Sequence, residues 1–512
     1  MRLMLHIFKK DVRRLWWAVA ATLLLLAALA HADRWRADWI VGSTEGWLAL
    51  LLPLAWCCLI ALAVNQEPLV DDREFWMTRP YRWPTLLGSK LLFVALFIHL
   101  PSLIADAAIL GFRGFQPLAY VPQLFWKQIV LAAVLTVPAM ALAALMKNIA
   151  HFLLAAILIL GAAAYLAGVA DPIRAPWIPM DEVRYSLAAL VLALPACALV
   201  LVQYARRRTV PARIAGTAAV VLAGLLFGYL PSTFTNRVRA MLYPAHVIVV
   251  HLSSSPQESY PYNSDNGSGP VQVGLPLTVS GLSATSDVQF GRPTLEIVGP
   301  EGQRYRTPAR SASRNFATID LDAYTNFGLQ NWLVLRLRRS VYDRIKNGKI
   351  LVKGICTLAL HRQGETTWMP IGASQAAAGI GRCSTIVEPS NLYSDAMLKV
   401  LCESPYAIPA LTRVRLWRPE TGRVWDHRLG DGGTPVSGPR ESWLSPLNRM
   451  NTHFQLAPAA AANGYGQQWL VPRDALANGK LAITPYPTTA WAVVDFDFPD
   501  ITLSDYVRPP AR

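Results

Sequence analysis

Seven long apolar runs in the first 231 residues constrain the fold more than any other feature of this chain. Each run is rich in Leu, Ala and Val, and is close to the roughly 20 residues that a helix needs to cross a bilayer core. The runs lie at 15–32, 47–64, 91–112, 128–145, 149–169, 185–204 and 214–230. The sequence therefore predicts a polytopic α-helical membrane domain over 15–231 with seven spans, preceded by an interfacial helix at 1–14. A plain positively charged anchor is an equally compatible interpretation of 1–14.

The basic residues between the runs predict the orientation of the chain. Membrane proteins concentrate Lys and Arg in their short cytosolic connections. With the N-terminus in the cytosol, the inner connections hold fourteen Lys and Arg residues and the outer ones six. Because the number of predicted spans is odd, residues 232–512 are expected to be extracytoplasmic. No long basic block accompanies the net charge of +15, so membrane lipid is the expected partner and nucleic acid is not.

Beyond residue 231 the apolar runs give way to short alternating strands separated by turn residues. The strands are expected at 247–252, 271–280, 294–299, 332–338, 350–362, 412–418, 481–486 and 491–498. Such strands must stack in two sheets to bury one face, so an all-β region is predicted. Asn-Gly-Lys recurs at 347–349 and 478–480, which indicates two β-sandwiches over 232–371 and 382–512 with a linker at 372–381. Chance is the alternative reading of that repeat, because Asn-Gly is common in turns.

Three cysteines fall in the predicted extracytoplasmic half, where disulfides form. Cys383 and Cys402 flank a short segment, whereas Cys356 lies inside an apolar strand. We therefore expect a Cys383–Cys402 disulfide, with Cys356 buried as a thiol.

A charged island at 67–90 separates the second and third apolar runs. Acidic residues come first, then the aromatic pair Phe75 and Trp76, then a basic turn around Pro80. This order predicts a short amphipathic helix on the cytosolic membrane surface, ended by Pro80 because proline clashes with the preceding helical turn. An ordinary basic cytosolic loop is the alternative.

The spacing of Glu67, Pro80 and Lys90 resembles the coupling loop of type-2 ABC transporter permeases. In that family an acidic residue opens the loop, a proline follows thirteen positions on, and a lysine lies about ten further along. This chain departs from the pattern at Asp71 and Asp72, where a small Gly-Thr pair is usual. The resemblance covers roughly residues 1–205.

The resemblance implies a subunit that moves substrate, usually outward, across a bacterial inner membrane with energy from a separate ABC ATPase. Two permease chains would form a homodimer or heterodimer, and the ATPase would bind the ATP and Mg²⁺. The outer β region would bind substrate or a periplasmic protein. The residues expected to couple this chain to the ATPase are Glu67, Glu74, Phe75, Trp76, Arg79, Pro80 and Lys90.

No catalytic or cofactor motif was found in the sequence. The phosphate-binding G-x-x-x-x-G-K-[ST], the zinc motif H-E-x-x-H, a pair of Cys-x-x-Cys elements and the hydrolase pentapeptide Gly-x-Ser-x-Gly do not occur. We therefore expect neither enzymatic activity nor a bound cofactor or metal. This disfavours a membrane-anchored extracellular enzyme. A non-transporting assembly or sensor subunit, with an outer region that binds a ligand or protein, remains the alternative.

Two polar residues, His99 and Asp106, lie two helical turns apart in the third apolar run. An ionisable group inside a membrane is costly, and is by default a functional candidate. The alternative is structural: Asp106 would meet water at the outer end, and His99 would bond to a neighbouring helix.

Overall fold

The computed structural model describes residues 2–34, 42–67, 82–170, 181–206, 209–229, 232–242, 244, 248–252, 270–283, 285–291, 293–307, 320–327, 331–389, 396–405, 411–428, 446–457 and 471–506. The chain divides into two compact units. The helical unit comprises Met1–Ala170, Asp181–Leu230 and Pro439–Asn448, and the β unit comprises Asp171–Met180, Pro231–Gly438 and Arg449–Arg512.

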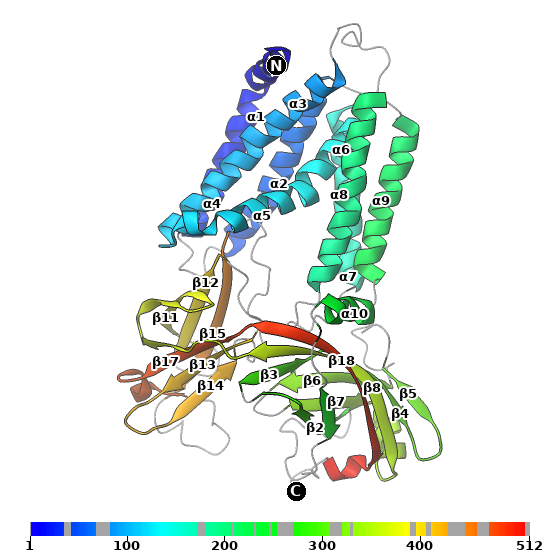
Figure 1. Ribbon diagram of the computed structural model, residues 1–512, viewed down its shortest axis with the longest axis vertical. Coiled ribbons are helices and arrows are strands. Elements are labelled where there is room, and N and C mark those ends of the chain that lie inside the picture. The colour runs from blue at the N-terminus through cyan, green and yellow to red at the C-terminus, as the bar shows by residue number, and fades with distance from the viewer. Residues whose placement is uncertain are drawn as a thin grey trace. The chain divides into compact units, whose positions relative to one another are not determined.

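The helical unit contains long helices, two of them interrupted by π-helical turns (Figure 1). In chain order its elements are α1 (Arg2–Arg34), α2 (Gly42–Val64), α3 (Trp83–Val94), the π-helix η3 (Ala95–His99), α4 (Leu100–Phe112), the 3-10 helix η4 (Pro117–Tyr120), α5 (Val121–Leu131), the π-helix η5 (Ala132–Thr136), α6 (Val137–Leu145), α7 (Ile149–Ala170), α8 (Asp181–Arg206) and α9 (Thr209–Tyr229). Every predicted span coincides with helix.

Of the seven predicted spans, the described residues show five as helices long and apolar enough to cross a membrane. These are Arg2–Ala32, Trp83–Phe112, Pro117–Leu145, Leu187–Arg206 and Thr209–Leu226. At the other two predicted spans, the apolar stretches found among the described residues are Leu50–Val64 within α2 and Ile149–Ile159 within α7.

The N-terminal helix also differs from the prediction, because α1 runs through residue 14 without a break. The interfacial segment at 1–14 and the first predicted span are thus one helix. No proline or glycine lies within α1, so nothing interrupts the backbone where the charged residues end.

The core of the helical unit joins residues from α1, α2, α3, α6 and α8. Trp56 and Phe93 are among its largest fully buried side chains. Alanines of α6, such as Ala143 and Ala144, are also buried there. Small side chains let membrane helices approach closely, which accounts for the contacts of α6 with α2 and α8.

Each π-helical turn ends two residues before a proline. Pro101 follows η3, and Pro138 follows η5. A proline lacks the amide hydrogen and crowds the carbonyl four residues earlier. Those carbonyls belong to Phe97 and Val134, which lie inside the widened turns. The two prolines therefore explain why each helix changes from α-helical to π-helical hydrogen bonding at these positions.

The β unit opens with α10 (Ser232–Leu242) and a first β-sandwich. Its elements are β1 (Val249–Leu252), β2 (Val271–Ser280), β3 (Ser286–Phe290), β4 (Thr294–Val298), β5 (Arg304–Arg306), β6 (Leu321–Phe327), β7 (Asn331–Leu337), α11 (Arg339–Ile345), β8 (Ile350–Arg362) and β18 (Thr488–Ile501). Within the described residues one sheet has the order β1-β2-β7-β6, and the other β18-β8-β4-β5 with β3 also paired to β8. Leu335 from the first sheet and Val352 from the second share one core.

The second sandwich encloses a separate core. Its elements are β9 (Thr367–Pro370), β10 (Ser374–Ala377), β11 (Gly381–Pro389), β12 (Ala396–Ser404), β13 (Leu411–Trp417), β14 (Val424–Arg428), β15 (Asn448–Ala457), β16 (Val471–Pro472) and β17 (Lys480–Tyr486). The described strands form sheets with the orders β10-β11-β12-β15-β16 and β14-β13-β17-β9. Val400 and Val414 meet in the core between them.

The boundary predicted at 372–381 does not divide the two sandwiches. Residues 374–377 of that stretch form β10, and the preceding β9 pairs with β17 in the second sandwich. The C-terminal β18 returns to the first sandwich, where it pairs antiparallel with β8 (Figure 1). Phe496 and Phe498 of β18 are buried in the first core, and their burial favours this long-range pairing over a local one.

A disulfide joins Cys383 of β11 to Cys402 of β12 inside the second core. The two residues are directly opposed in the antiparallel pair. Cys356 of β8 is buried as a free thiol in the first sandwich. Burial, and secondarily the charge of Asp495, raises the pKa of Cys356 to about 12. This thiol therefore stays protonated and unreactive at neutral pH.

Replacing Cys383 and Cys402 together by alanine should destabilise the second sandwich by roughly 2–4 kcal/mol, the usual contribution of a native disulfide. The change removes a constraint on the unfolded chain and leaves the first sandwich intact. Chemical unfolding of the purified protein measures the loss, with Cys356→Ala as the matched control that removes a thiol without a cross-link. Non-reducing peptide mapping that finds Cys356 in the bridge would contradict the pairing.

Candidate functional site

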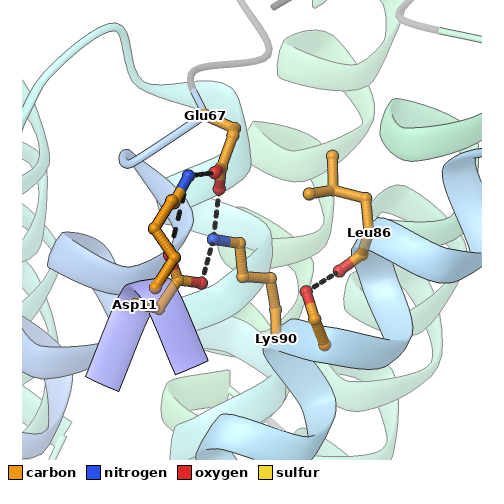
Figure 2. Close-up of polar contacts among 6 residues, drawn as sticks. Asp11, Glu67, Leu86 and Lys90 are labelled. Atoms are coloured by element: carbon orange, nitrogen blue, oxygen red, sulfur yellow. Dashed lines mark hydrogen bonds and ion pairs between the residues drawn. The ribbon is translucent and has the colours of Figure 1, made fainter. Parts of the chain in front are cut away.

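A buried ion network lies at the two ends of the charged island 67–90. Asp11 comes from α1, Glu67 follows the end of α2, and Lys90 lies on α3 (Figure 2). Their exposed fractions are 0%, 5% and 1%. Lys90 Nζ donates to Asp11 Oδ2 at 2.7 Å and also to Glu67 Oε2. Lys10 Nζ donates to the other carboxylate oxygen of Glu67, Oε1.

The network balances two carboxylates against two ammonium groups. Burying a charge costs several kcal/mol unless it is paired, and here each charge has an opposite partner. Burial acts to raise the pKa of Glu67, but Lys90 and Lys10 outweigh it and hold that pKa below its usual value. Glu67 therefore stays ionised at neutral pH and keeps both of its bonds.

Local sequence positions Lys90 for these contacts. Pro84 lies in the first turn of α3, where proline is favoured, so the helix begins at Trp83. Lys90 then lies seven residues further along, about two helical turns. Next to it, Ser89 Oγ donates to the Leu86 carbonyl at 2.7 Å, which satisfies a buried hydroxyl (Figure 2).

The arrangement joins three chain segments through one ammonium group. A displacement of either end of the island must move α1, the end of α2 and α3 together, or break buried charge pairs. Glu67 and Lys90, both predicted to couple to an ATPase, are thus brought together by the structure and buried. The other predicted coupling residues, Glu74, Phe75, Trp76, Arg79 and Pro80, lie outside the described residues.

Sequence reasoning missed Asp11 and Lys10 as members of this site. The sequence does contain one signal for this site: Asp11 is the single acidic residue in the basic stretch Lys9–Arg14. The next acidic residue of α1 is Asp33, in the last turn of the helix. A lone acid among four basic residues is a candidate for a charge pair. The partner could not be identified from the pattern, because Lys90 is 79 residues away.

The structure does not bring His99 and Asp106 together. His99 Nδ1 lies 3.0 Å from Gln128 Oε1, and its Nε2 lies 3.3 Å from Thr136 Oγ1. His99 therefore bonds to a neighbouring helix, as the structural alternative expected. Asp106 differs from that alternative: it is 2% exposed, and it accepts a hydrogen bond from Lys127 Nζ at 2.6 Å.

These contacts join the two arms of a helical hairpin, α3–η3–α4 and η4–α5–η5–α6. Gln128 Nε2 also donates to Ser102 Oγ at 3.4 Å, so the bonds continue along the arms. Hydrogen bonds of this kind help to hold membrane helices together, because the hydrophobic effect does not drive helices to associate within lipid. Among the described residues no group of three or more His, Cys, Asp or Glu could hold a metal ion.

Comparison with protein-family models and with curated proteins finds no match for this chain. Its function must therefore be inferred from its own residues. The most distinctive arrangement is the charge-balanced network of Asp11, Glu67 and Lys90, which ties both ends of a charged island to three helices.

Proposed function

We propose that this chain is the membrane-spanning permease subunit of an ABC transporter, working in export with a separate ATPase subunit. The observation that carries the proposal is the burial of Glu67 and Lys90 as a pair, together with Asp11. It supports a loop 67–90 with fixed ends, which is what a coupling element requires. A loop with loose ends would absorb the movement of a docked partner instead of transmitting it.

Docking itself is assigned to the middle of the loop. Phe75 and Trp76 form the apolar anchor in a cleft of the ATPase, and Glu74 and Arg79 form the polar rim that sets the angle. Pro80 ends the docking helix. When the ATPase binds ATP and Mg²⁺ and closes, the displaced loop pulls on α1, α2 and α3 through Lys90. This chain contributes no nucleotide site of its own.

The remaining parts of the proposal concern assembly and placement. Two permease chains, identical or different, enclose the pathway in a bacterial inner membrane. The basic residues of the short connections favour a cytosolic N-terminus and an extracytoplasmic β unit. The β unit binds substrate or a periplasmic protein.

Reporter fusions test this topology. A fusion after residue 208 should give a cytosolic signal, and a fusion after residue 300 an external one, because one candidate span, α9, lies between the two points. Expression of each fusion is measured in parallel, so that a missing signal is not mistaken for a location. The same location at both points contradicts the scheme.

Purification from native membranes in a mild detergent tests the function. A permease subunit should bring with it an ABC ATPase in fixed stoichiometry, and ATP hydrolysis should elute in the same fraction. A non-transporting sensor or assembly subunit would elute without an ATPase. That second result would overturn the proposal.

A further inference from the structure

A short amphipathic helix begins the β unit. α10 (Ser232–Leu242) carries Phe234, Val238, Met241 and Leu242 at positions i, i+4, i+7 and i+8, which is one face of a helix. This apolar face is open: the exposed fractions are 48% for Phe234, 78% for Met241 and 66% for Leu242. Val238 between them is half-buried, so three of the four apolar side chains are open. An exposed apolar patch of this kind indicates an interaction surface.

The chain itself places the start of α10 close to a membrane boundary. α9 is one of the five helices long and apolar enough to span a membrane among the described residues, and it ends at Tyr229. Three residue steps separate Tyr229 from Ser232, a reach of about 10 Å at most. The headgroup layer on each side of the hydrocarbon core is about 5–8 Å thick. α10 must therefore begin in or next to that layer if α9 spans.

α10 is also held by protein. The helix contacts β18, and just beyond its end Pro244 forms a bridge to Trp491 of that strand. The helix is thus fixed to the β unit while its apolar stripe stays open. The sequence of α10 contains no acidic residue, and Arg237 is exposed beside the stripe. Apolar and basic side chains together match the acyl boundary and the phosphate groups of a phospholipid surface.

We propose that α10 is an interfacial helix that binds the phospholipid surface on the side of the membrane where α9 ends. Phe234, Met241 and Leu242 enter the acyl boundary, and Arg237 lies at the level of the lipid phosphates. The helix fixes the β unit at the membrane surface, whichever substrate or partner that unit serves. This inference rests on α9 spanning the membrane and is independent of any ATPase.

The test uses the full chain in phospholipid nanodiscs and a fluorescent label on single cysteines. The background replaces Cys57, Cys58, Cys197 and Cys356 by alanine and keeps the Cys383–Cys402 disulfide. Labels are placed by Phe234→Cys and Met241→Cys on the stripe, by Arg237→Cys beside it, and by Glu301→Cys as control. Glu301 lies in the exposed turn between β4 and β5. Quenching is measured with nitroxide-labelled lipid and with aqueous iodide.

At 234 and 241 the lipid quencher should remove most of the fluorescence and iodide little of it. The control at 301 should show the reverse, and the label at 237 should show less lipid quenching than the label at 241. Iodide quenching at 234 and 241 as strong as at 301 would overturn the proposal. Protection from both quenchers would also overturn it, because that result would mean that protein covers the stripe.

Discussion

Replacing Lys90 by methionine is expected to destabilise the helical unit by about 3–5 kcal/mol, the usual cost of leaving a buried charge without its partner. Methionine keeps most of the side-chain length and removes the ammonium group. Lys10 still donates to Glu67, so the uncompensated charge is chiefly that of Asp11, which is 0% exposed. Thermal unfolding of the purified protein in detergent measures the loss.

A double variant separates charge from packing at this site. Asp11→Asn combined with Lys90→Met removes both partners of the Lys90–Asp11 ion pair and leaves the Lys10–Glu67 pair, so it should recover most of the lost stability. Lys147→Met, at an exposed lysine of the same unit, controls for the loss of a lysine as such. If Lys90→Met lowers the stability of the helical unit no more than Lys147→Met does, the result would contradict the buried network.

Replacing Phe75 and Trp76 together by alanine is expected to abolish co-elution of the ATPase while the chain itself stays folded. Truncating a buried aromatic anchor costs on the order of 2–4 kcal/mol of binding, a factor of roughly 30 to 1,000 in affinity. Glu74→Ala, at the proposed rim, should weaken binding less, because an exposed rim charge contributes mainly to the rate of association. Size-exclusion chromatography of the co-expressed complex gives the ATPase yield.

The matched control is another adjacent aromatic pair on this chain. Trp16 and Trp17 of α1 are 47% and 70% exposed and lie outside the loop. Their replacement by alanine removes the same kind of interfacial side chain and should leave the ATPase yield at the wild-type level. Equal yields from both double variants would mean that Phe75 and Trp76 only face lipid headgroups.

Elements whose own residues carry a strong pattern could be predicted from the sequence. Every apolar run became helix, and the alternation in 271–280 and 350–362 located β2 and β8 within a residue. β11 was missed, because GRCSTIVEP has little alternation, and it forms a strand by pairing along its whole length with β12. The formation of β11 therefore depends on its pairing with β12, and the propensities of its own residues do not encode that pairing.

The candidate site was likewise predicted only in part. The spacing of Glu67 and Lys90 along the chain could be recognised from the sequence. Their third partner, Asp11 on α1, could not. Asp11 joins them through a contact across 79 residues, and no periodicity specifies such a pairing. The division of the β unit failed for the same reason, since β18 crosses back to β8 after the second sandwich.

The central claim is that the middle of loop 67–90 touches an ATPase, and site-specific photo-crosslinking tests it most directly. A photoreactive phenylalanine analogue replaces Trp76 in one sample and Trp126 in another; Trp126 is 65% exposed on α5 and is predicted to lie near the outer surface. The account predicts a crosslink from position 76 to an ABC ATPase and none to it from position 126. Crosslinks from position 76 to lipid or to this chain alone, with the ATPase present, would contradict it.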